Sequence, residues 1–279
     1  MIPALNTKTN MLLVDDDSYL LRDLCDFLPK SHSFKTFTSP IAGLDYVKNL
    51  PHAKAREKES LFNDFKSAKF EDMTSVIVVD YSMDPINGLE FCERLDNTTA
   101  KRIMLTSHAT KDLAIQAFNN KLIDVFLLKT ESDMLDNLAT AIKKCTIEFF
   151  KDISVGIEGF NSKHNPLFCS HFSRFFLDFC ISNKIQSHCC FHDFYNILLQ
   201  DIHGKEMFMA IYDNEHLEDL LNSEQAESAE QRIIDQIKNR QAAPCFKDTG
   251  SALIPDGAAW DKLMVPLTFV SQDLNVAIG

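Results

Sequence analysis

Short apolar runs alternate with longer amphipathic stretches from residue 11 to about residue 150. The apolar runs predict strands, and the stretches between them, in which apolar residues recur every three to four positions, predict helices. Strands that are apolar along their whole length are typical of a parallel sheet covered on both faces. We therefore expect an α/β fold: a doubly wound, five-stranded parallel sheet flanked by helices. The expected strands are Met11–Asp15, Ser33–Phe37, Ser75–Asp80, Arg102–Thr106 and Asp124–Leu128, and the expected helices lie near 18–29, 40–49, 87–97, 109–120 and 132–150.

One connection in this pattern, residues 51–75, is unusually long. Helix-to-strand connections in such folds usually take roughly 2 to 6 residues. The segment is rich in lysine and glutamate, so we expect a short exposed helix and interpret it as a solvated insertion rather than a partner site.

The pattern changes after residue 150. Residues 151–166 are polar and contain Gly156, Gly159 and Pro166, which is typical of a linker. Phenylalanines then recur at helical spacing from Phe168 to Phe179, and an aromatic stripe of this kind indicates a core more often than a cofactor site. We expect an N-terminal domain at 1–150, a linker at 151–166 and a mixed α/β domain at 167–279.

Within the C-terminal domain, the sequence predicts a mixture of helices and strands. We expect helices at 191–202, 214–221 and 227–241, a strand at 205–213, and one or two strands between Leu263 and Ile278. The final "LNVAIG" is typical of a strand and carries no termination signal, so the sequence leaves open whether Gly279 is the native end or the chain is truncated there.

Composition is that of an ordinary soluble globular protein. Hydrophobic residues make up 45% and charged residues 24% of the 279 positions, and no run approaches the roughly 18 apolar residues of a membrane span. The length favours two domains. The opening "MIPALNTKTN" lacks the pattern of a secretory signal, so we expect a cytoplasmic protein without a membrane partner, in which the eight cysteines are thiols.

The chain is acidic, with a formal net charge of −12. Residues 147–279 contain 10 lysines and arginines against 19 aspartates and glutamates. Because proteins that coat phosphate backbones are usually basic, DNA is an unlikely partner on these numbers.

Polar residues that could bind a metal or take part in a reaction end or follow four of the five expected strands. Asp15 and Asp16 end the first strand, Asp80 ends the third, Thr106 ends the fourth and Lys129 follows the fifth. In doubly wound sheets the carboxyl ends of the strands meet at one edge, where functional residues gather. Three carboxylates there form a hard oxygen site that suits Mg²⁺.

Four segments of residues 9–150 resemble the receiver domain of two-component response regulators. They are "LLVDDD", "VIVVDYSMDPINGLEF", "RIMLTSHA" and "DVFLLKT". Receiver domains transfer a phosphoryl group from a kinase histidine, or from a small donor, to an aspartate. The resemblance implies that Asp80 is this phosphoacceptor, and that Asp15, Asp16, Asp80 and the backbone carbonyl of Ser82 bind Mg²⁺.

The resemblance also assigns residues around the phosphoryl group. It implies that Lys129, Thr106 and the small Ser107 contact or border that group, and that Phe126 is the aromatic side chain that moves together with Thr106. Such a pair forms a two-state element, as a phosphorylation switch requires. In-line phosphoryl transfer needs mainly positioning and charge neutralisation, which Mg²⁺ and a lysine supply.

Two positions depart from the family pattern. Asp84 stands where a proline is usual, followed by Pro85, although Gly88 keeps its expected spacing. Thr130 replaces the proline that usually follows the lysine in a cis peptide. A cis bond before a non-proline residue costs about 2.5 to 4 kcal/mol, so we expect either a trans bond with a rebuilt loop or a cis bond kept at that cost.

Isolated aspartates, threonines and lysines at strand ends are commonly turn formers or helix caps. Five of them in register at one edge favour a phosphoacceptor over a pseudo-receiver. We therefore expect a two-component response regulator whose partner is a sensor histidine kinase or a histidine phosphotransfer protein. Phosphorylation would switch a non-DNA-binding output domain, by changing homodimerisation or other protein interactions.

The alternative is a receiver-regulated enzyme, or a nucleotide- or ligand-binding domain, in residues 167–279. Neither a G-G-[DE]-E-F segment nor a G-x-x-x-x-G-K-[ST] segment occurs, and the His192–Asp193 pair is weak support for a phosphohydrolase. A zinc site is a minority interpretation, because cysteines within an apolar stripe are usually small core residues. Its candidate ligands are Cys169, His171, Cys180, His188, Cys189, Cys190 and His192.

Overall fold

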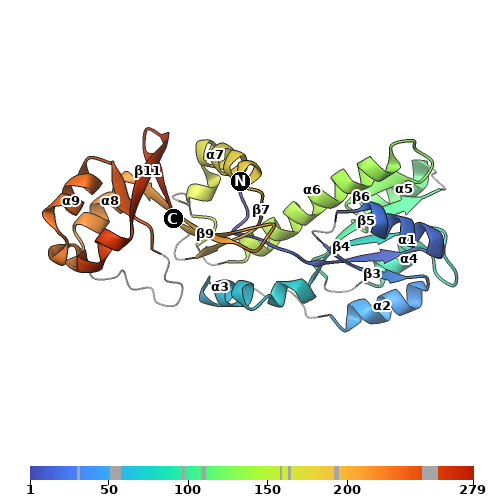
Figure 1. Cartoon of the computed structure of the whole chain (residues 1–279). Helices are drawn as coiled ribbons and strands as arrows, with labels where there is room; N and C mark the ends of the chain where they lie inside the picture. Colours follow the sequence, from blue (N-terminus) through green and yellow to red (C-terminus); the bar gives the residue numbers. More distant parts are fainter. Residues whose placement is uncertain are drawn as a thin grey trace. The chain divides into compact units, whose positions relative to one another are not determined.

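The computed structural model describes residues 1–29, 32–50, 58–95, 98–107, 111–157, 159–162, 165–191, 195–246 and 257–279. The chain forms two compact units made of interleaved segments (Figure 1). The α/β unit comprises Thr7–Ala55 and Ser67–Ile153. The composite unit comprises Met1–Asn6, Arg56–Lys66 and Ser154–Gly279.

The α/β unit contains a five-stranded parallel sheet, as the sequence predicts. Its strand order is β3-β2-β4-β5-β6, and every neighbouring pair is parallel. The bounds agree with the predicted strands to within about two residues at each end, the usual uncertainty of such boundaries. The strands are β2 Asn10–Val14, β3 Ser33–Phe37, β4 Thr74–Val79, β5 Lys101–Thr106 and β6 Val125–Leu128.

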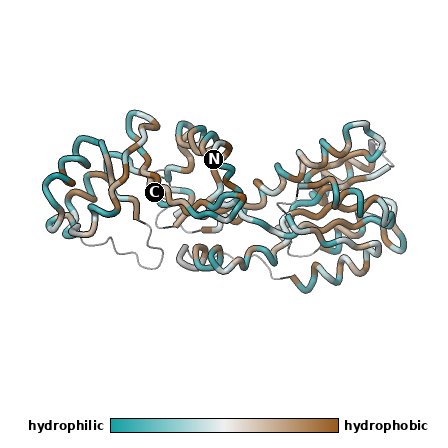
Figure 2. The backbone as a smooth tube through the Cα atoms, in the orientation of Figure 1, coloured by the Kyte–Doolittle hydropathy of each residue, from teal (hydrophilic) through white to brown (hydrophobic). Residues whose placement is uncertain are grey.

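Helices cover both faces of this sheet. Successive residues of a strand point to opposite faces, so Met11 and Leu13 pack beneath α1 and α6, whereas Leu12 and Val14 pack against α2, α4 and α5. The hydrophobic colouring in Figure 2 follows these strands. The helices of the unit are α1 Ser18–Phe27, α2 Pro40–Lys48, η1 Lys69–Asp72, α4 Gly88–Glu93, α5 Lys111–Asn119 and α6 Met134–Val155.

Side-chain caps determine where three of these helices begin. The carboxylate of Asp17 accepts hydrogen bonds from the first turn of α1, and the hydroxyl of Ser39 caps α2. Asn87 and Glu90 form a reciprocal capping box at the start of α4. Such side chains satisfy backbone N–H groups that have no partner within the helix. The loops after β2 and β4 are therefore held firmly where they turn into α1 and α4.

The composite unit contains a seven-stranded antiparallel sheet in the order β1-β7-β8-β9-β12-β11-β10. Together with its helices, this sheet makes the unit a mixed α/β fold, in agreement with the prediction. Its strands are β1 Leu5–Asn6, β7 Ile185–Phe191, β8 Asn196–Asp201, β9 Glu206–Asp213, β10 Ala242–Pro244, β11 Met264–Ser271 and β12 Leu274–Ile278.

One core of the composite unit lies between the sheet and its C-terminal helices. Leu217 of α8, Ile233 of α9 and Trp260 pack with Tyr212 and Ala277 of the sheet. The predicted helix at 214–221 is confirmed, with Asp213 as its N-terminal cap. The helices of the unit are α3 Lys58–Lys66, η2 Pro166–Phe168, α7 Ser170–Ser182, α8 Asn214–Leu221, η3 Glu224–Ser228, α9 Gln231–Lys238 and η4 Gly257–Lys262.

The structure corrects the predicted helix at 191–202. Phe191 ends strand β7, and residues 196–201 form strand β8. Both strands carry runs of consecutive buried residues, and a short run that is apolar throughout shows neither helical nor alternating periodicity. Residues 192–194 lie outside the described part of the chain.

The long connection at 51–75 is only partly as expected. A helix is present, α3, but it is not a solvated insertion, because Leu61, Phe62 and Phe65 are buried within the composite unit. The expected linker at 151–166 also begins inside helix α6, which continues to Val155. The chain therefore divides differently from the contiguous domains expected at 1–150 and 167–279.

Candidate acidic phosphoacceptor site

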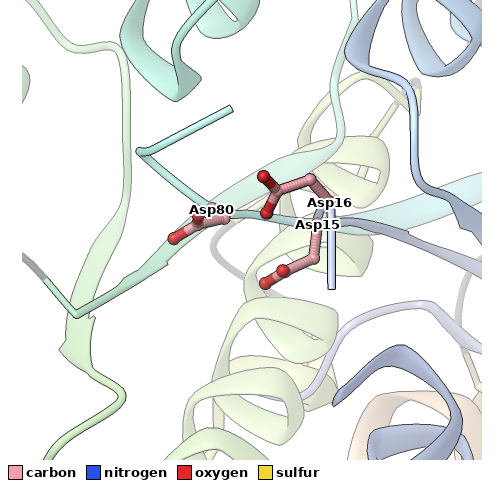
Figure 3. Close-up of side chains that lie close together, drawn as sticks. All are labelled: Asp15, Asp16 and Asp80. Atoms are coloured by element: carbon pink, nitrogen blue, oxygen red, sulfur yellow. The ribbon is translucent and has the colours of Figure 1, made fainter. Parts of the chain in front are cut away.

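Three carboxylates lie together at the carboxyl edge of the parallel sheet (Figure 3). Asp15 and Asp16 follow β2, and Asp80 follows β4, the neighbouring strand. Each offers a carboxylate oxygen, and these oxygens lie within 4.8 Å of one another. Asp15 and Asp80 are buried, whereas Asp16 is exposed. The register of two parallel strands therefore brings together the residues that the sequence predicts as a metal site.

Lys129 is the positive charge among these carboxylates. Its ammonium Nζ lies 2.6 Å from Asp15 Oδ2 and 3.1 Å from Asp80 Oδ1. Only 15% of the lysine side chain and 5% of each aspartate side chain are exposed, so solvent screens these pairs much less than it would at the surface. The backbone N–H of Lys129 also donates to the carbonyl of Thr106. This hydrogen bond holds the backbone of Lys129 beside the end of β5.

The pKa of Asp15 and the pKa of Lys129 are both shifted upward, but for different reasons. Burial raises the pKa of the Asp15 carboxyl, and the hydrogen bonds from Lys129 and from the Asp17 N–H offset this only in part. Burial alone would lower the pKa of Lys129, but its hydrogen bond to Asp15 and the negative charges of Asp15 and Asp80 outweigh burial and raise it. Lys129 is therefore a permanent cation at neutral pH.

The two oxygens of Asp80 have different surroundings. Oδ2 accepts a hydrogen bond of 3.1 Å from the backbone N–H of Ser82. Oδ1 is buried, and within the described part of the chain it accepts no hydrogen bond, although the ammonium of Lys129 lies near it. The three carboxylates, including this buried Asp80 oxygen that lies against the Lys129 ammonium, form an oxygen donor set that fits a hard divalent cation such as Mg²⁺.

Gly88 holds the loop after Asp80 close to the end of strand β4. Its N–H donates to the carbonyl of Tyr81 at 2.9 Å. A Cβ atom at this position would lie 2.3 Å from the backbone oxygen of Asp80, closer than any side chain allows. The close approach of two backbone segments therefore requires glycine here.

The two departures from the family pattern have different outcomes in the backbone. The Asp84–Pro85 peptide bond is cis, and it is the one cis bond among the described residues. The Lys129–Thr130 bond is therefore trans, which settles the alternative that the sequence leaves open. Lys129 nevertheless reaches both aspartates, while Asp84 is exposed.

The remaining predicted site residues lie on or beside strands β5 and β6. Thr106 is fully buried at the end of β5, and Ser107 beside it is exposed. Phe126 on β6 is half-buried and packs against the core beneath α2, α4 and α5. Ser82, whose carbonyl is a predicted metal ligand, is exposed. The roles of these four residues stay predictions.

The candidate zinc ligands are dispersed by the strand geometry. Cys189 and Cys190 are adjacent buried positions of β7, so their side chains point to opposite faces of the sheet. The ring of His188 is hydrogen-bonded to the carbonyl of Pro3 at 3.0 Å and contacts Phe176 edge-on. His192 lies outside the described residues. Among the described residues, the acidic cluster of Asp15, Asp16 and Asp80 is the group close enough to hold a metal ion.

A second polar cluster, which the sequence analysis did not anticipate, lies in the composite unit. The carboxylate of Asp213 accepts hydrogen bonds from the hydroxyl of Tyr195 and from the ring and backbone nitrogens of His216. The hydrogen bond from the backbone N–H of His216 caps helix α8. The rings of Tyr195 and His216 stack with their centroids 3.5 Å apart. Capping and stacking account for these contacts without a ligand.

Comparison with known proteins identifies the class to which the acidic site belongs. Residues 11–143 match the response regulator receiver domain family, so this part of the chain is a receiver domain. No curated protein matches the sequence significantly. No helix in the described part of the chain is long and apolar enough to span a membrane.

A solved response regulator resembles the chain over nearly its whole length. The response regulator LqsR of Legionella pneumophila superposes with a TM-score of 0.82 at 25% identity, covering 99% of this chain and 88% of that one. A CheY-like receiver domain protein of Methanospirillum hungatei JF-1 matches 52% of this chain and 99% of its own, with 19% identity and a TM-score of 0.41. The receiver domain and the LqsR-like architecture together support a two-component response regulator.

Proposed function

We propose that Asp80 accepts a phosphoryl group in a Mg²⁺-dependent reaction and that this modification switches the composite unit. The observation that carries the proposal is the pairing of the half-buried Lys129 with the buried carboxylates of Asp15 and Asp80. The phosphodonor would be a sensor histidine kinase or a histidine phosphotransfer protein. A cytoplasmic location belongs to the same proposal.

In this reaction an Asp80 carboxylate oxygen forms a bond to phosphorus while the bond from phosphorus to the donor nitrogen breaks. The nitrogen keeps the bonding electron pair. Asp15, Asp16, Asp80 and the carbonyl of Ser82 would hold Mg²⁺, which supplies neutralisation of the phosphoryl oxygens when bound. Lys129, positioned by Asp15, would pair with one of those oxygens.

The proposed switch continues from the same phosphoryl group. The hydroxyl of Thr106 would donate a hydrogen bond to a phosphoryl oxygen, and exposed Ser107 would leave the group accessible to water. Phe126 would change its packing as Thr106 moves. Because Phe126 is half-buried against the core, such a change has room to occur and alters a helix-covered face of the domain.

The test is the intact mass of the protein after incubation with acetyl phosphate and Mg²⁺, with a phosphorylated histidine phosphotransfer protein as second donor. We expect one phosphoryl adduct on the wild type and none on Asp80→Asn. Asp84→Asn, which changes an exposed carboxylate of the same loop, serves as a control that keeps the adduct. An adduct retained by Asp80→Asn, or no adduct from either donor, would overturn the proposal.

For the composite unit we propose an output through protein interactions, including homodimerisation, rather than through DNA. Its excess of acidic residues supports this choice. Light scattering on the phosphorylated and unphosphorylated samples would detect the change of assembly. A shift of the melting temperature with nucleotides would instead favour the alternative, a ligand-binding or enzymatic output.

A further inference from the structure

Two segments from the first half of the chain complete the composite unit. They are the N-terminal strand β1 with the residues that precede it, and helix α3. Both lie against β7, because β1 pairs with β7 at one edge of the sheet and α3 packs along the same strand. We call these two segments the straps.

The first strap is held mainly by backbone hydrogen bonds. The N–H of Ile2 donates to the carbonyl of Leu167, and the carbonyl of Ala4 accepts from the N–H of Cys190 at 2.7 Å. The N–H of Ala4 donates to Ser154 Oγ at 2.9 Å. Ile2 and Ala4 are buried. A segment with so many directed bonds has one register, and it covers an edge of β7 that would otherwise be open.

The carbonyl of Pro3 and the side chain of Leu5 add to this attachment. Pro3 accepts a hydrogen bond from the buried ring of His188. Leu5 lies opposite Cys189 in the sheet and is fully buried. The first strap is therefore part of the core of the composite unit and not a surface appendage.

The second strap is held mainly by apolar packing. Leu61, Phe62 and Phe65 occupy one side of α3 and are all buried. The ring of Phe62 lies 4.9 Å from that of Phe191, at the end of β7. Burial of side chains of this size is the main contribution by which a short helix stays attached to a sheet.

An ion pair marks the end of α3. Lys66 Nζ lies 2.6 Å from Glu206 Oε1, which also accepts from Gln200. About a third of each charged side chain is exposed, so solvent screening leaves this pair a small energetic contribution. Its effect is orientational, since it fixes the last turn of α3 against the start of β9.

Each strap leads directly into a strand that carries part of the acidic site. Only residues 7–9 separate β1 from β2, which is followed by Asp15 and Asp16. The short helix η1 separates α3 from β4, which is followed by Asp80. After each strap, the chain thus leaves the composite unit and enters β2 or β4, which are neighbouring strands of the parallel sheet.

We propose that the straps form a conformational device: they hold β7 in the composite unit, and the state of the acidic site changes how firmly they are attached. The second part rests on the proposed function, since it requires that the acidic site be phosphorylated. The composite unit is then regulated through two chain connections to the α/β unit, one after β1 and one after α3, in addition to helix α6.

Hydrogen–deuterium exchange on the full-length protein tests the first part. Phe62→Ala on α3 and Leu5→Ala on β1 each remove buried side chains of a strap. We expect exchange in peptides covering β7 to become at least tenfold faster, with little change in β2 and β4. The matched control is Leu44→Ala, which removes a buried leucine of α2 in the α/β unit and is expected to leave β7 unchanged. Unaltered exchange of β7 in both strap variants would overturn the proposal.

The second part is tested by adding beryllofluoride and Mg²⁺ as a phosphoryl mimic to the wild type and to Asp80→Asn. We expect exchange in β1 and α3 to change at least threefold in the wild type only. If the loop between β4 and α4 becomes protected while the straps do not respond, the regulatory part is wrong and the proposed function stands. If neither responds and no phosphoryl adduct forms, the proposed function and the regulatory part both fall, and the strap variants decide the structural part.

Discussion

Lys129 lies closer to Asp15 than to Asp80, at 2.6 Å against 3.1 Å. Asp15 therefore has a second role besides its predicted part in binding Mg²⁺. By accepting a hydrogen bond from Lys129, it positions the ammonium beside the carboxylate that would be phosphorylated. An acidic residue that orients a lysine in this way makes the positive charge available before the phosphodonor arrives.

Removal of Lys129 should destabilise the α/β unit. Lys129→Ala leaves two buried carboxylates without their cation, and breaking a buried ion pair of this kind costs about 3 kcal/mol at pH 8. The loss should be smaller at pH 5, because burial raises the pKa of the Asp15 carboxyl, and a buried carboxyl that has lost its cation takes up a proton more readily as the pH falls. Urea unfolding followed by circular dichroism at the two pH values measures the difference. Lys48→Ala, an exposed lysine of α2, is the control, and an equal loss in both variants would contradict the interpretation.

Mg²⁺ should bind at the acidic cluster and depend on Asp16, its exposed member. Asp16→Asn removes one negative charge from a donor set that has three carboxylates and one lysine, so we expect at least a tenfold weaker affinity. Isothermal titration calorimetry with MgCl₂ measures it. Asp26→Asn removes an exposed carboxylate of α1 outside the cluster and should bind Mg²⁺ like the wild type. Equal affinities in all three proteins would place the metal elsewhere.

Gly88 should tolerate no side chain. In Gly88→Ala the new Cβ would collide with the backbone oxygen of Asp80, and the relief of such a contact by backbone movement costs about 3 kcal/mol. The phosphoryl adduct should also fall, because the movement displaces Asp80. Gly43→Ala in α2 is the matched control, since its Cβ would meet side-chain atoms of Phe91 and Val14 at 3.3 Å. Thermal unfolding and intact mass on both variants separate the two cases.

The stability of the composite unit should fall as the pH decreases below 6.5. Burial lowers the pKa of His188 in the folded chain to about 4 from an unfolded value of 6.5. Between these values the unfolded chain binds a proton that the folded chain does not, so the free energy of unfolding decreases by up to about 1.4 kcal/mol per pH unit. Urea unfolding of the wild type, followed by the fluorescence of Trp260, measures this dependence between pH 7 and pH 4.5.

His188→Gln should make this pH dependence shallower while keeping a donor for the carbonyl of Pro3. His203→Gln, in an exposed turn after β8, should leave the pH dependence as it is. An unchanged slope in His188→Gln would show that another group is responsible.

The α/β unit could be predicted almost completely from the sequence, because most of its strands contain short apolar runs and its turns carry capping and acidic residues. The composite unit could not. Its strand β8 falls within a predicted helix, since "NILLQ" is too short for its periodicity to separate a helix from a doubly buried strand. The signal for α3 was present in the spacing of Leu61, Phe62 and Phe65, but the surrounding lysines and glutamates favoured a solvated helix.

The members of the acidic site could also be predicted, because strand ends in a parallel sheet meet at one edge. The sequence could not predict which oxygen Lys129 approaches. That choice depends on the side-chain torsions of Lys129 and on the local backbone after β6. Distances of a few tenths of an ångström follow from such local geometry and leave no trace in residue spacing.

The interleaving of segments has an evolutionary consequence. When a receiver and an output domain are joined by one linker, a single recombination event between genes can exchange either partner. Here the composite unit takes Met1–Asn6, Arg56–Lys66 and Ser154–Gly279 from three places in the chain, so one crossover would separate a domain from its own strand or helix. We expect this receiver domain and the composite unit to be inherited together, and chimaeras built at one junction to misfold.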